Sequence, residues 1–405
     1  MALSSTSEHA DGAWELPHEL QMLRETVADF VRKEIVPLEK DLDYEAYKLP
    51  PDHLARVQGL AREAGLWCVE SPEEYGGGGL SLLAQCVVAE EAAQCRMGAY
   101  VPAGAAFGWD PPNVIFKAPD ELIQRFAVPT IEKGEKTFVA ISEPSGGADP
   151  GRAIKTTARR DGDEYVLNGS KVWITGADAS RWGIVFARTG GPGRRGISCF
   201  VVETDTPGFT MQPIPVIRPL YPMELFFEDV RVPAEYLLGE EGRGFELVED
   251  WLVHGRVPYA AGTIGVATAA LKIATDYAKD RHTFGRPLAQ RQAIQWMLAD
   301  SEIELRAARL LTYQAAWKAD MGKDFKVDAS VAKVYATETA GRVVDRCIQI
   351  LGGMGVAKEM PLERWYRELR IKRIGEGPSE VHRLVVARSM LGGAARELTV
   401  AAGER

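Results

Sequence analysis

The hydrophobic pattern of this chain changes its period twice, and this change constrains the fold more than any other feature. From about residue 15 to residue 134, apolar residues recur at three- and four-residue spacing, as Leu20, Leu23 and Val27 do. That spacing is typical of amphipathic helices. Residues 135–240 instead contain short β-branched or aromatic runs, and the helical spacing returns after Gly239. The order predicts an all-α segment, an all-β segment and a second helical segment.

The middle segment reads as a series of short strands punctuated by glycine, aspartate and proline. The dipeptides Asp161-Gly162 and Asn168-Gly169 predict tight turns between strands. Roughly seven or eight short strands of this kind favour an antiparallel barrel or sandwich. The predicted strands are residues 137–142, 153–159, 164–168, 170–175, 183–187, 198–203 and 223–230.

The last segment reads as a helical bundle. Alanine and leucine recur along one stripe from Ala260 to Ala278, and the pattern ends at Phe284-Gly285. Three further long helices are expected at about 288–321, 327–351 and 379–393, which gives an antiparallel four-helix bundle. The predicted class is α+β. The predicted domains are an N-terminal α-helical domain (1–134), a β-barrel domain (135–240) and a C-terminal helical bundle (241–405).

The composition excludes several classes of protein. The formal charge of −9 argues against nucleic acid or an anionic membrane surface as the main partner. No apolar run approaches the ~18–20 residues of a membrane span, and the acidic N-terminal stretch lacks the apolar core of a signal peptide. These features predict a soluble, cytoplasmic protein.

The cysteines and histidines give no sign of a disulfide framework or a metal site. The five cysteines are scattered and form no C-x-x-C pair, which fits free thiols in a reducing compartment. The six histidines form no H-E-x-x-H motif and no ligand cluster. No metal is therefore expected.

One turn near the C-terminus places a lone carboxylate, Glu376, between Gly375 and Gly377. The two glycines leave the carboxylate and its backbone open to a ligand. Pro378 and the apolar residues after it mark the start of a helix. A carboxylate on a stiff turn beside open space suits the removal of a proton from carbon. The alternative is an acidic residue that merely favours a helix N-terminus.

Two motifs of the β segment present small and polar groups. Residues 141–149 read Ile-Ser-Glu-Pro-Ser-Gly-Gly-Ala-Asp, a strand end whose Ser142 hydroxyl can hydrogen-bond the polar edge of a flat ligand. A turn between strands is the alternative for this loop. Residues 167–176 carry Trp173 and Thr175 on one face of a strand, because strand side chains alternate. Trp173 could equally be a core residue of the barrel.

Two motifs of the helical segment end helices in glycine. Residues 280–287, Asp-Arg-His-Thr-Phe-Gly-Arg-Pro, expose Arg281, whose guanidinium suits a pyrophosphate. Residues 349–355, Gln-Ile-Leu-Gly-Gly-Met-Gly, allow close approach to a ligand. Ordinary helix caps would account for both glycine clusters, and such caps are compatible with ligand binding.

In their order, these five motifs resemble those of the acyl-CoA dehydrogenase family, over about residues 15–392. The resemblance implies FAD as the cofactor and a homo-oligomer, a dimer or tetramer, with FAD at the subunit interface. It implies cofactor contacts at Ile141, Ser142, Gly147, Ala148, Trp173, Thr175, Arg281, Thr283, Phe284, Gln349, Gly352, Gly353, Pro378 and Glu380.

The resemblance also assigns the reaction. It implies α,β-desaturation of an acyl-CoA thioester, in which Glu376 takes the α proton and the β hydrogen leaves as hydride to flavin N5. An electron-transfer flavoprotein is the implied electron acceptor. The implied substrate contacts are Arg256, Gly375 and Gly377, although a salt bridge within the bundle is an equal alternative for Arg256.

The chain departs from the family pattern at several positions. Ser142 stands for a threonine and Ala148 for a serine, while Pro378 replaces a threonine. Gly375 replaces a common aromatic residue, which predicts a wider pocket. That room suits a branched, cyclic or otherwise bulky acyl group, and a long chain is the alternative. Some members carry the base near residues 251–256, where this chain has acids only at Glu246, Glu249 and Asp250.

Two other functions remain open from the sequence. One is an acyl-CoA oxidase-like or monooxygenase-like flavoenzyme that reacts with oxygen, and a carboxylate at position 376 argues only against the monooxygenase. The other is a flavin-containing binding protein with a DNA-binding tail. The C-terminal tail is short and balanced in charge, which disfavours that function.

Overall fold

The computed structural model of the protein describes residues 15–392 and 394. The acidic N-terminal stretch and almost all of the C-terminal tail lie outside these residues. The described chain forms two compact units. The first combines the residues up to Val57, Ser81–Gly104 and the residues from Gly255 onward. The second combines Gln58–Leu80 with Ala105–His254. The three domain boundaries drawn from the sequence remain a prediction.

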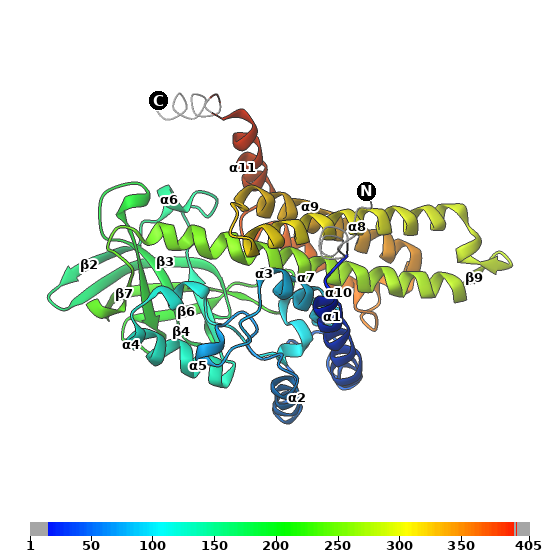
Figure 1. Cartoon of the computed structure of the whole chain (residues 1–405), viewed down its shortest axis with the longest axis horizontal. Coiled ribbons are helices and arrows are strands. Elements are labelled where there is room, and N and C mark those ends of the chain that lie inside the picture. Colours follow the sequence, from blue (N-terminus) through cyan, green and yellow to red (C-terminus); the bar gives the residue numbers. More distant parts are fainter. Residues whose placement is uncertain (1–14, 393, 395–405) are drawn as a thin grey trace, which may run out of the picture. The chain divides into compact units, whose positions relative to one another are not determined.

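The first unit is helical, and its C-terminal part is built on long helices (Figure 1). It confirms the predicted long helices and adds α10, which the sequence analysis missed. α10 has only a few apolar residues, and part of its buried face is charged, since Arg364 pairs with Glu368 inside the protein at 3.0 Å. The helices are α7 (Gly244–Asp280), α8 (Gln292–Asp320), α9 (Lys326–Leu351), α10 (Leu362–Lys372) and α11 (Ser379–Leu391).

Small side chains allow the bundle helices to pack closely. Ala260, Ala267 and Ala274 on α7 are fully buried in one core with Val343 and Val344 of α9. α7 is long and apolar enough to cross a membrane by length and composition, but 67% of its most apolar stretch is buried inside the protein. A core helix of a bundle has these same properties.

The N-terminal part of the chain is also helical, as predicted. Asp320 at the end of α8 accepts hydrogen bonds from the N–H groups of Leu82 and Leu83, at 2.8 and 3.0 Å, and so caps α3. The helices here are α1 (His18–Phe30), α2 (Pro51–Glu63), α3 (Leu82–Ala92), α4 (Asp120–Leu122) and α5 (Val128–Lys133).

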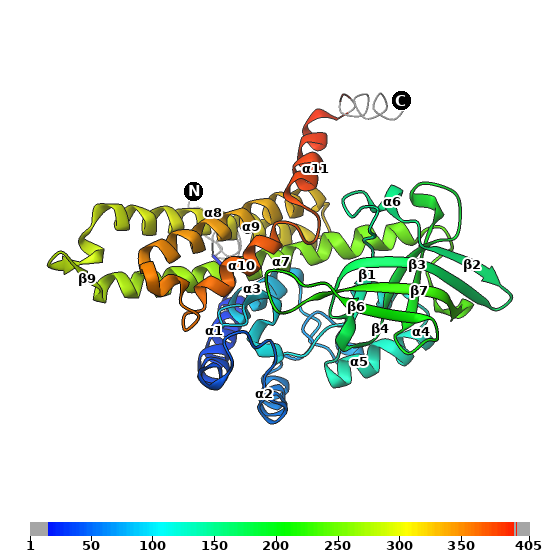
Figure 2. The same ribbon diagram turned by 180° about the vertical axis from the view of Figure 1, so that it is seen from behind.

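The second unit contains one eight-stranded sheet, seen in Figure 2. Its neighbours run in the order β6-β7-β3-β2-β4-β5-β8, and β1 pairs with β4. Most pairs are antiparallel, but β1 and β2 are parallel to β4. The strands are β1 (Lys136–Ala140), β2 (Thr157–Asp161), β3 (Glu164–Thr175), β4 (Ser180–Arg188), β5 (Ile197–Glu203), β6 (Phe209–Pro213), β7 (Pro222–Pro233) and β8 (Leu237–Leu238).

The predicted turn at Asn168-Gly169 is wrong, because β3 continues through it. Gly169 has a φ of +146° at an irregularity in the pairing of β3 with β7. The amide of Asn168 both donates to the Asp229 carboxylate and accepts from the Asp229 N–H, each at 2.9 Å. A Cβ at Gly169 would lie 2.6 Å from the Thr156 hydroxyl. The dipeptide therefore forms a bulge inside a long strand.

Two other strand boundaries differ from the prediction. The strand expected at 153–159 begins at Thr157, because Pro150–Ala153 forms the short helix α6. β6 was not predicted, since only Phe209 in it is buried and the strand has little alternation. The physical reason is the same in both cases: these segments carry too few buried apolar residues to give a period.

A buried ion pair anchors the loop that follows β1. The ammonium of Lys171 donates to the Glu143 carboxylate at 2.8 Å and to the carbonyl of Ile141 at 3.1 Å. Glu143 also accepts from the N–H groups of Lys155 and Thr156. Burial alone would raise the pKa of Glu143, but Lys171 and these N–H groups lower it below its usual value. Burial lowers the pKa of Lys171 to about 8.

Replacing Lys171 by methionine should destabilise the protein by about 3–5 kcal/mol, because Glu143 would stay buried without its partner. The measurement is the free energy of unfolding from urea titration of the protein. Arg231→Met breaks an exposed pair with Glu164 and should cost less than about 1 kcal/mol. Equal losses for the two variants would contradict a special role for the buried pair.

Candidate active site

The turn between α10 and α11 carries Glu376 in an unusual backbone conformation. Glu376 has a φ of +56°, a region that residues with a Cβ seldom adopt. Gly377 follows with a φ of +91°, and Pro378 then begins α11. Such a conformation costs of order 1–3 kcal/mol and persists only where surrounding groups hold it.

Hydrogen bonds to two carbonyl groups hold this turn. The guanidinium Nε of Arg256 and the Nε2 of His382 both reach the carbonyl oxygen of Glu376, at 3.2 and 3.0 Å. The ammonium of Lys333 donates to the carbonyl oxygen of Gly377 at 2.6 Å. Arg256 comes from α7, Lys333 from α9 and His382 from α11. The turn is therefore fixed by side chains from three helices.

His382 acts in this turn as a neutral hydrogen-bond donor. Its ring is fully buried, and burial together with the positive charges of Arg256 and Lys333 lowers its pKa to about 4. Since the carbonyl of Glu376 only accepts, Nε2 carries the proton and donates. Nδ1 then accepts from the Ser330 hydroxyl at 3.1 Å. The carbonyl of Glu376 thus fixes the tautomer, and Ser330 partners the other ring nitrogen.

The carboxyl group of Glu376 is set up as a base. Burial raises its pKa, while Arg256, Lys372 and Lys333 oppose the rise. Its Oε2 is buried and has no hydrogen-bond partner in the described part of the chain. A carboxylate with a raised pKa is a stronger proton acceptor than an exposed one. An unpartnered buried oxygen in a native protein calls for a functional explanation.

The acids that compete for the role of base are engaged in ion pairs. Glu249 contacts Arg194 at 3.0 Å, and Asp250 contacts Lys117 at 2.6 Å. Glu246 contacts Arg243 at 3.0 Å. Among these four carboxylates, Glu376 is the one with a buried, unpartnered oxygen.

The prediction that Gly375 widens the pocket is wrong. A Cβ on Gly375 would lie 2.8 Å from the hydroxyl oxygen of Tyr259, so the space beside this glycine is already taken. Gly377 differs, because its positive φ itself favours glycine, and a Cβ there would lie 3.1 Å from Nε2 of His382.

In the second unit, Ser142 and Trp173 are held side by side. The N–H of Val172 donates to the carbonyl of Ser142 at 2.9 Å, which joins the loop after β1 to β3. Trp173 has a φ of +66° at a second irregularity of β3, and 59% of its surface is exposed. Thr175 is exposed on the same face. Trp173 is therefore not a core residue, and the bulge aims its ring outward.

The loop after Ser142 is open at its far end. Gly147 and Ala148 are exposed, whereas Ile141 is buried beneath the loop. A Cβ on Gly147 would lie 3.0 Å from the Ser142 hydroxyl, so glycine lets the loop fold back over Ser142. These residues lie together as predicted, and Glu143 and Lys171 support them from inside.

The motif at 280–287 forms a hairpin of β9 (His282–Thr283) and β10 (Arg286–Pro287). Phe284 at its tip is 96% exposed and has a φ of +50°. The guanidinium of Arg291 donates to the carbonyl of Thr283 at 2.6 Å and lies 5.7 Å from the Phe284 ring centroid. Arg281 is exposed at the base of the hairpin. No pattern in the sequence indicates that Arg291 shapes this tip.

The motif at 349–355 ends α9 in open space. Gln349, Gly352 and Gly353 are exposed, and no atom lies within 4 Å of a Cβ built on either of these glycines. Gly352 has a φ of +60° and follows α9 as its C-cap. Of the remaining predicted cofactor residues, Pro378 precedes α11 and Glu380 is exposed in its first turn.

The side chains exposed on each unit, taken separately, have the chemistry that a flat ring or a phosphate needs. Trp173 and Phe284 offer large aromatic surfaces that are uncovered in the chain, and Arg281 offers a guanidinium to phosphate. Within the described residues, no group of three or more His, Cys, Asp or Glu side chains is placed to hold a metal ion.

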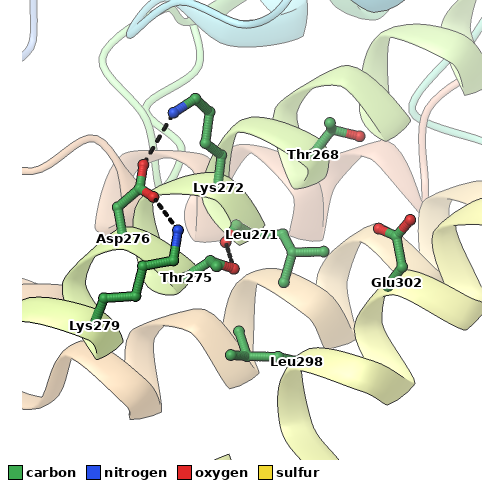
Figure 3. Close-up of a pocket in the computed structure, with 8 residues that line it drawn as sticks. All are labelled: Thr268, Leu271, Lys272, Thr275, Asp276, Lys279, Leu298 and Glu302. Atoms are coloured by element: carbon green, nitrogen blue, oxygen red, sulfur yellow. Dashed lines mark hydrogen bonds and ion pairs between the residues drawn. The ribbon is translucent and has the colours of Figure 1, made fainter. Parts of the chain in front are cut away.

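A surface groove of about 480 Å³ lies between α7 and α8 (Figure 3). Its Asp276 pairs with Lys272 at 2.9 Å and with Lys279 at 3.1 Å, as the dashed lines show. No predicted site residue lines this groove. Because its central charges are already paired, it does not compete with the Glu376 turn as a reaction site.

Several groups that build the turn are not evident from the sequence. Lys333, Ser330 and His382 support Glu376, and Lys372 and Tyr259 lie beside it. Each is a polar residue within a helical pattern, so spacing alone does not separate it from a surface residue. The sequence does contain one signal, because Lys333 falls on the apolar stripe of α9 with Ala329 and Ala336.

Comparisons with known proteins agree with the fold. Three family models match: acyl-CoA dehydrogenase N-terminal domain (17–126), middle domain (139–230) and C-terminal domain (242–391). The mitochondrial short-chain specific acyl-CoA dehydrogenase of Rattus norvegicus is 40% identical over 383 residues, covering 93% of this chain and 91% of the relative.

Solved structures give the same result. Butyryl-CoA dehydrogenase from Megasphaera elsdenii matches with a TM-score of 0.83 and 35% identity, covering 93% of this chain and 99% of that chain. A chain from the structure of the electron transferring flavoprotein of Acidaminococcus fermentans has a TM-score of 0.84 and 34% identity, with coverage of 94% and 99%.

The chain therefore belongs to the acyl-CoA dehydrogenase family. Its activity is that of an acyl-CoA dehydrogenase, and the family uses FAD. The resemblance drawn from the motifs and the predicted order of helical, β and helical segments are both confirmed.

Lowering the pH should reduce the stability of the wild type more than it reduces the stability of the His382→Gln variant. The pKa of His382 is about 4 in the folded protein against an ordinary 6.5, so the unfolded chain binds more protons between these values. Stability is therefore lost as the pH falls through this interval, by about 3 kcal/mol over its full width. Thermal melting at pH 7 and pH 4.5 measures this difference.

The exposed His18 provides the control, because His18→Gln should keep the pH response of the wild type. If His382→Gln also melts in parallel with the wild type at both pH values, His382 is not the group whose protonation destabilises the fold.

Proposed function

We propose that the enzyme desaturates the acyl group of an acyl-CoA thioester between its α and β carbons, with Glu376 as the base that removes the α proton. The observation that carries this proposal is the buried Oε2 of Glu376, which has a raised pKa and no protein partner in the described chain. The competing acids near residue 250 are engaged in ion pairs.

The backbone of the turn also supplies a hydrogen-bond donor for the substrate. Loss of the α proton puts negative charge on the thioester oxygen, and donors aimed at that oxygen are needed to stabilise it. The N–H of Glu376 makes no hydrogen bond within the described residues. The left-handed conformation, held through the Glu376 and Gly377 carbonyls, keeps this N–H available to the substrate. Removal of one such donor typically costs about 3–4 kcal/mol.

In each catalytic cycle the Glu376 carboxylate gains one proton and loses it again. Its neighbours make both the ionised and the protonated form accessible. Burial favours the protonated form, which makes the carboxylate a strong acceptor. Arg256, Lys333 and Lys372 favour the ionised form and so limit that effect. Entry of an acyl chain beside Glu376 would displace water and strengthen both influences.

We propose FAD as the cofactor; when bound, it would supply the oxidant that takes up the β hydrogen together with its electron pair. We assign the flavin ring to the surface around Ile141, Ser142, Trp173 and Thr175. We assign the phosphates to Gly147, Ala148 and, from a neighbouring subunit, to Arg281, Thr283, Phe284, Gln349, Gly352 and Gly353. Pro378 and Glu380 are assigned to the cofactor from the start of α11.

The acyl group is proposed to be short and unbranched. This proposal replaces the bulky substrate expected from Gly375, because Tyr259 fills the space beside that residue. Relatives named for short-chain acyl-CoA and for butyryl-CoA support a short chain. An electron-transfer flavoprotein is the proposed electron acceptor. The buried free cysteines support the proposed cytoplasmic location.

Self-association is proposed from α8 and the hairpin that precedes it. Large apolar side chains of α8 recur every seven residues and remain exposed in the single chain, which is typical of a helix that packs against another subunit. The exposed Phe284 at the hairpin tip fits the same role. The α8 residues are Trp296, Ile303, Leu310 and Trp317.

Glu376→Gln should keep its FAD and bind acyl-CoA but lose desaturation. A missing general base typically lowers the rate by ~10²–10⁴. The measurement is the bleaching of the flavin absorbance by butyryl-CoA without oxygen. Glu249→Gln and Asp250→Asn should bleach at the wild-type rate. Wild-type bleaching in Glu376→Gln, with loss in either control, would move the base to that residue.

Arg281→Ala should weaken FAD binding about 10- to 100-fold, because a hydrogen-bonded charge pair with phosphate contributes about 1.5–3 kcal/mol. The measurement is the dissociation constant of FAD from titration of the apoenzyme. Arg286→Ala removes another exposed arginine of the same hairpin and should leave FAD binding unchanged. Equal affinity of the two variants for FAD would contradict the assignment of Arg281 to the phosphates.

A further inference from the structure

Gly375 is a glycine for reasons of space and not of backbone conformation. It is absent from the glycines with positive φ, so its φ and ψ suit any residue. A Cβ built on it would lie 2.8 Å from the Tyr259 hydroxyl oxygen, closer than real contacts allow. The hydroxyl of Tyr259, which comes from α7, therefore occupies the place that a side chain at position 375 would need.

Tyr259 is held in place by charged neighbours. The ammonium of Lys372 lies 3.8 Å from the Tyr259 ring centroid, and that of Lys333 lies 5.9 Å from it. Lys372 also donates to the carbonyl of Ala99 at 3.2 Å and lies 4.2 Å from the Tyr100 ring centroid. Lys372 is buried, so these contacts are shielded from water. A ring clamped in this way forms a rigid surface.

Tyr259 also lies beside the turn that carries Glu376. Its hydroxyl touches the residue that directly precedes Glu376, and part of its side chain remains accessible. One turn further along α7, a Cβ on Gly262 would lie 3.3 Å from the Ala99 side chain, so this stretch of α7 packs on the residues around 99. Carbons presented to the Glu376 carboxylate therefore meet the Tyr259 side chain.

We propose that Tyr259 is the specificity-determining residue for the acyl group, in place of a side chain at position 375. This inference rests on the proposed function of Glu376 as the base. Tyr259 fills the space that a substituent near the reacting carbons would need, and so it selects short, unbranched acyl groups. A missing or added methylene in an apolar site changes selectivity by about 10- to 200-fold, which sets the scale of the effect.

The test compares butyryl-CoA with the branched isobutyryl-CoA and isovaleryl-CoA. Tyr259→Ala should raise the kcat/KM of the branched substrates relative to butyryl-CoA at least ~10-fold. Tyr259→Phe should raise the ratio less than Tyr259→Ala does, because the ring stays in place and only the hydroxyl beside Gly375 is lost. Tyr366→Ala removes an exposed tyrosine of α10 and is the matched control. An unchanged ratio in a folded, FAD-loaded Tyr259→Ala variant would overturn the proposal.

A double variant that exchanges the two side chains distinguishes a specific effect from a loss of folding. Gly375→Tyr alone should lose acyl-CoA binding, because its Cβ meets the Tyr259 hydroxyl. The double variant Tyr259→Ala/Gly375→Tyr should regain binding and the preference for butyryl-CoA. Failure of the double variant to improve on Gly375→Tyr would contradict the exchange of the two side chains.

Binding measurements separate this inference from the assignment of the base. In a Glu376→Gln background, calorimetry with butyryl-CoA, isobutyryl-CoA and isovaleryl-CoA reports selectivity without turnover. If Glu376→Gln remains active, the assignment of the base fails whatever the binding shows. If it is inactive and Tyr259→Ala does not change the relative affinities of the three thioesters, the role of Tyr259 fails alone.

Discussion

The geometry of the active site depends on the hydrogen bonds that hold the carbonyl groups of Glu376 and Gly377. Arg256 and His382 donate to the first carbonyl, and Lys333 donates to the second. These bonds offset the cost of a left-handed conformation at a residue with a side chain. In that conformation the carboxyl group is buried without a partner, and the backbone N–H stays available.

Four helices of the bundle supply this one turn. α7 contributes Arg256 and Tyr259, α9 contributes Lys333, α10 ends in Lys372, and α11 contributes His382. The close packing of small residues along α7 is therefore a condition of the chemistry, since a shift between helices would move these donors. In the second unit, too, a buried charged side chain holds a loop. Lys171 pairs with Glu143 and so fixes the loop of Ser142 from inside.

The sequence predicted what depends on local spacing. The order of helical, β and helical segments, the long bundle helices and the Glu376 turn were all visible as patterns. What it missed depends on contacts between distant residues. Asn168-Gly169 resembles a turn but forms a bulge, because Asp229 of β7 engages Asn168. α10 was missed because charged residues fill part of its buried face.

Gly375 shows the same limit at the level of the site. As a sequence feature it predicts open space, but the space belongs to Tyr259, which lies more than a hundred residues away in the chain. The same is true of Ser330, which hydrogen-bonds Nδ1 of the distant His382. Residue types were sufficient to identify the kind of reaction. The three-dimensional contacts were needed to identify the neighbours of Gly375 and His382.

The most direct test of the role of Glu376 is the exchange of α hydrogens in deuterated water. The wild-type, FAD-loaded enzyme should introduce deuterium at the α carbon of butyryl-CoA without oxygen, as measured by mass spectrometry. Glu376→Gln should introduce it at least ~10²-fold more slowly. Exchange at the wild-type rate in that variant would show that another group removes the α proton.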